Sequence, residues 1–149
     1  SGGKSSRLYK KMVDTKKVAV DVAAVNQSFE DYGIYVIITL PVGQNTLETL
    51  YDNIDEEIEK LKTELISDRE YEKLQNEFEN NFISTNSSIS GIANSLASYY
   101  LLHDNVNLIN ERLDIYKSIT KEEIKDVANK YLNKNSRAVI DYLPESSKQ

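Results

Sequence analysis

The hydrophobic pattern changes its period near residue 45, and that change does most to set the class of fold. Residues 18–25 (VAVDVAAV) alternate as a strand does, with one face made of Val18, Val20, Val22 and Ala24. Residues 34–40 (IYVIITL) are rich in β-branched and aromatic side chains and predict a second strand. The polar residues 26–33 turn the chain between them, so the two strands should pair antiparallel. From residue 45 onward, apolar residues recur every three or four positions, which is typical of helices.

Three capping pairs mark helix starts after that change. They are Asn45 with Glu48, Ser67 with Glu70, and Thr120 with Glu123. The first pair opens a helix of about twenty residues whose apolar stripe is Leu47, Leu50, Ile54, Ile58, Leu61 and Leu65. The polar residues 84–88 (STNSS) form helices poorly and predict a break between two further helices.

A last strand is predicted at residues 138–143 (AVIDYL), ended by Pro144. Two strands, several helices and a closing strand predict an α+β fold, with an antiparallel-rich sheet covered by helices on one face. By length, residues 1–149 form a single domain, with residues 144–149 as a frayed tail. Three strands make a thin sheet beside so much helix, so we expect an incomplete structural repeat.

Composition excludes several classes of function. The formal net charge of −6 argues against nucleic-acid binding, which needs clustered basic residues. Lys10, Lys11, Lys16 and Lys17 do cluster, and we interpret them as a solvated helix end. The longest apolar run, residues 34–42, is far shorter than the roughly 20 residues of a membrane helix, so no membrane span is expected. The chain has no cysteine and therefore no disulfide or thiolate chemistry.

No residue pattern predicts a catalytic, substrate-binding or metal site in this chain. Zinc enzymes use three protein ligands, whereas His103 is the only histidine, and it is expected at a helix C-terminus. Acidic residues crowd the first long helix and are interpreted as a solvated face opposite the apolar stripe: Asp55, Glu56, Glu57 and Glu59. Residues 2–5 (GGKS) match only the end of a phosphate-binding loop, whose other parts would have to precede Ser1.

Four segments, in this order and spacing, give the whole chain a resemblance to a known family. They are residues 5–9 (SSRLY), 64–68 (ELISD), 91–97 (GIANSLA) and 132–143. The chain resembles the later two-thirds of one repeat of the insulinase/pitrilysin (processing-peptidase-like) zinc metallopeptidases. Its sequence is more similar to the second, C-terminal repeat of the bacterial enzymes, which is non-catalytic. The chain resembles that repeat truncated at its N-terminus. The resemblance implies two layered repeats that close as a clamshell, with zinc bound by His-x-x-Glu-His in the other repeat.

The resemblance also shows a departure. Many family members place an arginine at the end of the first helix and a tyrosine seven residues later, and both reach the peptide. The matching positions here are Val13 and Val20, so no substrate-binding residue is carried over. The region of Gly2, Gly3 and Lys4 corresponds to the glycine-rich loop of the non-catalytic processing-peptidase subunit, and it is much shorter here.

The resemblance implies a zinc-dependent metalloendopeptidase as the parent protein, with this chain inactive alone. Its partners would be the zinc-bearing N-terminal repeat and peptide substrates, and its location the periplasm or cell envelope. An unpaired sheet edge predicts self-association of the isolated fragment. The alternative is a structural or assembly module that keeps the fold without proteolysis. The presence of His-x-x-Glu-His upstream of Ser1 in the full gene would separate the two.

Overall fold

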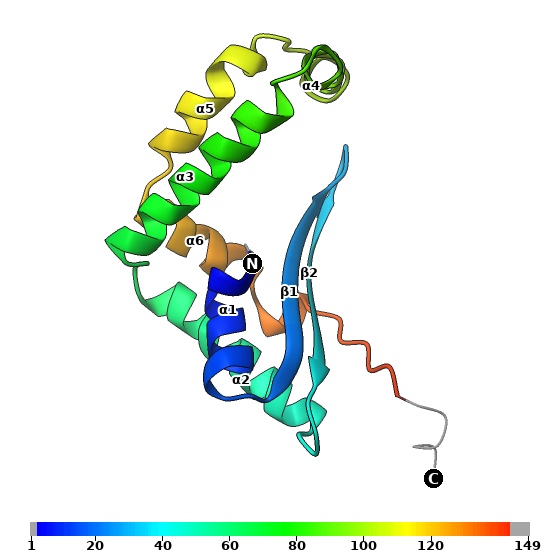
Figure 1. Ribbon diagram of the computed structural model, residues 1–149, viewed down its shortest axis with the longest axis vertical. Coiled ribbons are helices and arrows are strands. Elements are labelled where there is room, and N and C mark those ends of the chain that lie inside the picture. The colour runs from blue at the N-terminus through cyan, green and yellow to red at the C-terminus, as the bar shows by residue number, and fades with distance from the viewer. Residues whose placement is uncertain (1–2, 144–149) are drawn as a thin grey trace. The chain divides into compact units, whose positions relative to one another are not determined.

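The structure, a computed structural model, describes residues 3–143, which form two compact units (Figure 1). The first unit holds the residues up to 63 and those from 127 onward, and the second holds residues 64–126. The helices and strands are α1 (Arg7–Tyr9), β1 (Ala19–Ser28), β2 (Gly33–Pro41), α2 (Leu47–Thr63), α3 (Asp68–Thr85), α4 (Ile89–His103), α5 (Leu108–Ser118) and α6 (Lys121–Tyr131). The predicted α+β class is confirmed. The interpretation of residues 1–149 as one domain stays a prediction, and the tail 144–149 lies outside the described residues.

β1 and β2 form the predicted antiparallel hairpin. The turn closes with the N–H of Phe29 donating to the carbonyl of Tyr32 at 2.8 Å, and the two rings stand 5.1 Å apart. α1 and α2 pack on one face of this hairpin (Figure 1). On the other face Val25, Ile38 and Leu40 are exposed. Within the first unit, the sheet is therefore covered by helices on one face, as the sequence predicted.

A β-bulge at Val20 corrects the predicted strand faces. Ala19 lies opposite Pro41 and Asp21 opposite Leu40, so Val20 has no partner on β2. Proline has no N–H to donate to the ladder, and bulges accommodate such positions. The extra residue shifts the alternation: Ala19 is 4% exposed, whereas Val20 is 58% exposed. The prediction that Val20 shares the buried face with Val22 is therefore wrong.

The core of the first unit joins the hairpin to its helices. Its buried members are Met12, Val18, Ala19, Val22, Leu50 and Ile54. Met12 reaches this core from a π-helical turn, Lys10–Thr15, which continues α1. Inside that turn the N–H of Lys16 donates to the carbonyl of Lys11 at 2.8 Å, a spacing of five residues. The wider turn places Met12 fully inside.

Helix starts follow the capping pairs in two cases out of three. The side chain of Ser67 accepts from the N–H of Glu70 at α3. Before α6, Thr120 and Glu123 bond each other's N–H groups reciprocally, at 2.7 and 3.1 Å. The predicted Asn45 cap is wrong, because Thr46 Oγ1 accepts from the N–H of Thr49, the first turn of α2. Asn45 instead donates to the carbonyl of Val42 at 2.6 Å.

The second unit is a helical arrangement in which α3 and α5 pack side by side (Figure 1). The rings of Phe78 and Tyr116 stack between them, and Tyr71 Oη donates to the carbonyl of Ile119 at 2.6 Å. α3 ends at Thr85 and α4 begins at Ile89, so the predicted break at residues 84–88 is confirmed.

Gly91 is required at that break, and its replacement by alanine should destabilise the second unit. A Cβ at this position would lie 1.9 Å from the carbonyl oxygen of Thr85, a backbone atom that cannot rotate away. We expect Gly91→Ala to lower the free energy of unfolding by about 1 to 3 kcal/mol, as overpacking does. Urea unfolding followed by circular dichroism measures the loss. Ser90→Ala, in the same helical turn, is the control, and an equal effect of the two changes would contradict this role for Gly91.

The closing strand predicted at residues 138–143 is wrong. This segment has no strand partner among residues 3–143, where the sheet consists of β1 and β2. Its polar neighbours bond it to α2: Lys134 and Arg137 both contact Asp55, and Tyr51 bonds Asp141. The side chains of Ile140 and Tyr142 remain exposed. A β-propensity becomes a strand only where the segment lies alongside another strand, and here its contacts hold it against α2.

Candidate functional site

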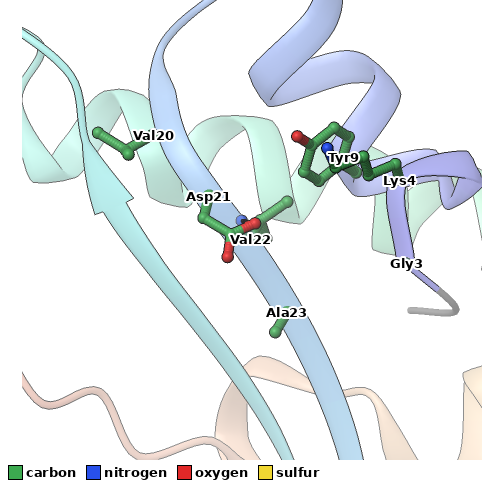
Figure 2. Close-up of a pocket in the computed structure, with 7 residues that line it drawn as sticks. All are labelled: Gly3, Lys4, Tyr9, Val20, Asp21, Val22 and Ala23. Atoms are coloured by element: carbon green, nitrogen blue, oxygen red, sulfur yellow. Dashed lines mark hydrogen bonds between the residues drawn. The ribbon is translucent and has the colours of Figure 1, made fainter.

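The candidate site is an open hollow of about 560 Å³ beside β1 (Figure 2). Its lining residues come from the turn before α1, from α1 and from the start of β1: Gly3, Lys4, Tyr9, Val20, Asp21, Val22 and Ala23. Tyr9 lies across the hollow from the strand residues, and Lys4 lies beside it (Figure 2). The hollow therefore combines apolar strand residues with one cation and one carboxylate.

Val13 and Val20, which match the peptide-contacting arginine and tyrosine of many family members, are called the clamp positions. Of the two, Val20 lines this hollow. The bulge turns its side chain outward, and bulges often re-aim side chains next to active sites. Val13 lies in the π-helical turn and packs partly buried against the core, outside the lining of the hollow. The structure thus does not bring the two valines together in one site, and neither carries a polar group for peptide binding.

A partly buried cluster of ion pairs joins Lys11 to α2 in the first unit, and the sequence did not lead us to predict it. Lys11 Nζ lies 2.6 Å from Glu56 Oε2 and 3.2 Å from Glu57 Oε1, and it donates to the carbonyl of Asn53 at 3.3 Å. Glu57 is 8% exposed. The predictions of a solvated acidic face and of a solvated lysine cluster are therefore wrong for Glu57 and Lys11. The sequence spacing could have indicated that Glu57 is buried, because residues 50, 53, 54 and 57 share one face of a helix, the face of the apolar stripe.

Two of the acids of α2, Asp55 and Glu56, have their pKa values lowered by cations. The hydrogen bond from Lys11, and then that from Lys60, lowers the pKa of Glu56 from 4.5 to about 2. Burial alone would raise the pKa of Asp55, but the hydrogen bonds from Lys134 and Arg137 outweigh it and lower that pKa. These contacts order the acidic face and fix the segment after α6 to α2.

Glu56 should give the first unit a distinct acid dependence. Its pKa is lower in the folded state, so its stabilising effect is present above pH 4.5 and is lost as the pH falls toward 2. We expect Glu56→Gln to unfold more easily than the original chain at pH 6, with the difference shrinking between pH 4.5 and 2. Urea unfolding at pH 6, 4 and 2.5 measures it. A constant difference at all three values would contradict this assignment.

The residues of this chain do not fit a catalytic zinc ion. Catalytic zinc sites hold the ion with three side chains drawn mostly from histidine, cysteine and glutamate, and the chain has one histidine and no cysteine. Among residues 3–143, no three such side chains lie close enough to hold a metal ion. His103 ends α4, and Asp104 follows in a left-handed conformation, so the expected place of His103 at a helix C-terminus is confirmed.

The phosphate-loop match of residues 2–5 stays a hypothesis, because the other parts of such a loop would precede Ser1. Gly3–Ser5 forms a short 3₁₀ turn, in which Gly3 has a φ of 64°, and Gly2 lies outside the described residues.

In the part of the chain that the structure describes, no helix has both the length and the apolarity needed to cross a membrane.

Comparison with known proteins assigns the chain to a family. Residues 1–78 match the family model of the Peptidase M16 inactive domain. The chain is 27% identical, over 142 residues, to the zinc protease PqqE of Helicobacter pylori. That match covers 95% of this chain and 32% of the relative, so the chain spans about a third of the relative's length.

Solved structures agree with this assignment. A protease from Helicobacter pylori superposes with a TM-score of 0.80 at 26% identity, covering 90% of this chain and 32% of that one. An inactive peptidase domain from Bordetella parapertussis superposes with a TM-score of 0.84 at 18% identity, covering 100% of this chain and 80% of that one. The second likeness concerns the fold alone. The resemblance stated from residues 5–9, 64–68, 91–97 and 132–143 is thereby confirmed, and through the match of residues 1–78 the chain belongs to the family of Peptidase M16 inactive domains.

Proposed function

We propose that this chain is the non-catalytic C-terminal domain of a bacterial zinc metallopeptidase. It pairs with an upstream repeat that carries His-x-x-Glu-His and the zinc ion, and together the two enclose unfolded peptides for proteolysis. The observation that carries the proposal is the match of residues 1–78 to an inactive peptidase domain, together with a donor set that does not fit zinc. The names of the relatives, which are zinc proteases, support the same proposal.

The role of this domain follows from what the catalytic repeat already supplies. The catalytic repeat supplies metal, ligands and base, while this domain supplies a second wall that limits access to extended chains. A domain that only limits access needs no polar side chains at the two clamp positions, so the apolar Val13 and Val20 are compatible with this role. A periplasmic or cell-envelope location belongs to the same proposal, and fractionation of cells that express the full gene tests it.

The test is hydrolysis of an unstructured fluorogenic peptide by this chain, by the upstream half and by their mixture, each with and without a chelator. We expect hydrolysis only in the mixture, abolished by the chelator. A folded protein that contains the same peptide sequence should resist the mixture. Replacement of the glutamate of His-x-x-Glu-His in the upstream half is the matched control and should remove activity without preventing assembly.

The second candidate is an assembly module that keeps the peptidase fold without proteolysis. The loss of both clamp side chains, at Val13 and Val20, favours it. Binding of the two halves with no hydrolysis, under conditions in which zinc is bound by the upstream half, would establish this second function and overturn the first.

A further inference from the structure

The helix α4 lies in the longest uncharged stretch of this chain. Residues 80–103 contain no Asp, Glu, Lys or Arg, although these residue types make up 28% of the sequence. The side chains on one side of α4 are exposed, and we call them the outer face of α4: Ser90, Ala93, Asn94, Ala97, Tyr100 and Leu101. A helix at the surface of a globular protein normally presents charged residues to water, so an exposed face without charge is typical of an interaction surface.

The opposite side of α4 has its partner within the second unit. α4 packs against α5 (Figure 1), where the guanidinium carbon of Arg112 lies 5.3 Å from the centre of the Tyr99 ring. Tyr99 is 7% exposed. Leu101 follows two residues later, about 200° further around the helix, and it is 75% exposed. The outer face therefore points away from α5.

Charge indicates which kind of surface can cover the outer face. The charged residues that bound the uncharged stretch are both acidic, Glu79 before it and Asp104 after it. In the second unit, residues 64–126, twelve acidic side chains stand against six basic ones. A second copy of the chain would bring the same acidic surroundings, and helices that lie on lipid carry Lys and Arg on their polar face. The complementary partner is therefore an apolar protein surface with a basic rim.

The rest of the same protein can supply that surface. The chain spans about a third of the length of the curated relatives it matches. Further strands of the same repeat would join the sheet, which belongs to the first unit, through main-chain hydrogen bonds. The main chain of α4 is bonded within its own helix, so its outer face needs the side chains of a packed partner instead.

We propose that the outer face of α4 is the surface through which this domain docks on the zinc-bearing repeat of the same protein. The inference rests on the proposed function and names the contact that holds the two repeats together. The zinc-bearing repeat presents an apolar patch to α4 and basic side chains to Asp104. The small side chains of Ala93 and Ala97 let a partner element approach closely, while Tyr100 and Leu101 supply the large apolar contact area.

Thiol labelling measures whether the outer face is covered. The chain has no cysteine, so Ala97→Cys places a single thiol on this face, and Asn76→Cys places a control thiol at an exposed position of α3. In the chain alone both thiols should react with a maleimide at similar rates. In the full-length protein, with any other cysteine replaced by serine, the Ala97→Cys thiol should react at least about tenfold more slowly and the Asn76→Cys thiol at an unchanged rate. An unchanged rate for Ala97→Cys would overturn the proposal.

A charge placed on the outer face tests the apolar contact. In the full-length Ala97→Cys protein, Leu101→Glu should raise the labelling rate at least about fivefold, because an unpaired carboxylate is costly in an apolar interface. Ile115→Glu makes the same change on α5, at a side chain that is 51% exposed, and should leave the rate low. Asp104→Asn should raise the rate about twofold at low salt and not at high salt. Equal rates for Leu101→Glu and Ile115→Glu would overturn the proposal.

Photo-crosslinking identifies what covers the outer face. The change Ser98→p-benzoylphenylalanine places a photoreactive group beside this face, at an exposed position of α4. Cross-links in the full-length protein, mapped by mass spectrometry, should fall in the zinc-bearing repeat. Cross-links only to residues between that repeat and Ser1, or only to a second copy of the protein, would overturn the proposal. Zinc-dependent hydrolysis by the full-length protein with a freely labelled outer face would leave the proposed function standing and remove only this inference.

Discussion

Replacement of Lys11 by methionine is expected to lower the free energy of unfolding of the first unit by about 1 to 3 kcal/mol. The ammonium group of Lys11 lies 2.6 Å from Glu56 and 3.2 Å from Glu57, and Glu57 is buried. Methionine keeps the length of the side chain, so the main loss is the charge. A buried carboxylate that loses one of its two cations is destabilising, because water solvates it poorly and the remaining cation, Lys60 at 3.1 Å, is itself partly exposed. Urea unfolding at pH 7, followed by circular dichroism, measures the loss.

Two variants separate the buried pair from ordinary surface charge. Lys16 contacts Glu56 at 3.4 Å at the surface, and Lys16→Met should cost less than about 1 kcal/mol. Lys11→Met combined with Glu57→Leu should recover much of the lost stability, because both partners of the pair are then apolar. Equal losses of unfolding free energy for Lys11→Met and Lys16→Met would show that the burial of Glu57 adds nothing to the cost of removing its cation.

The helical part of the fold followed from local chemistry. Capping residues such as Ser67 and Thr120 act within their own turn, so their roles can be predicted from neighbours three residues away. The hairpin was predictable for the same reason, since alternation and a short polar turn are local signals. Thr46 replaced Asn45 as the cap of α2, a shift of one residue at a helix end.

The strand bulge at the candidate site and the ion cluster of the same unit could not be predicted, because each depends on a partner farther along the chain. The bulge at Val20 arises opposite Pro41, and alternation along β1 alone gives no sign of it. Glu57 was interpreted as solvated because most helix acids are, whereas its burial requires Lys11 from another helix. The segment 138–143 has the composition of a strand, but pairing depends on a neighbour that composition does not reveal.

The recognition of the family rested on different information. Segments such as residues 91–97 carry the resemblance, and the structure adds a physical reason for one of their residues. Gly91 allows the carbonyl of Thr85 to approach the first turn of α4 more closely than any side chain permits. The clamp positions are the opposite case, because the fold places Val13 and Val20 in separate surroundings and gives neither a polar role.

Leu50→Ala is expected to lower the free energy of unfolding of the first unit by about 2 to 5 kcal/mol, the usual cost of a large-to-small change in a core. Leu50 is 1% exposed and belongs to the cluster that joins α2 to Met12 and Val22. A small sheet of two strands is marginal by itself, so its stability depends on this packing against the helices.

The matched control for Leu50→Ala is Leu101→Ala, which makes the same chemical change at a side chain that is 75% exposed and should cost less than about 0.5 kcal/mol. Urea unfolding gives both values, and amide exchange in β1 reports whether the hairpin opens first. Faster exchange in β1 of the Leu50 variant would show that this cluster holds the hairpin in place. Unchanged stability in that variant would mean that the hairpin is held by something other than the cluster around Leu50.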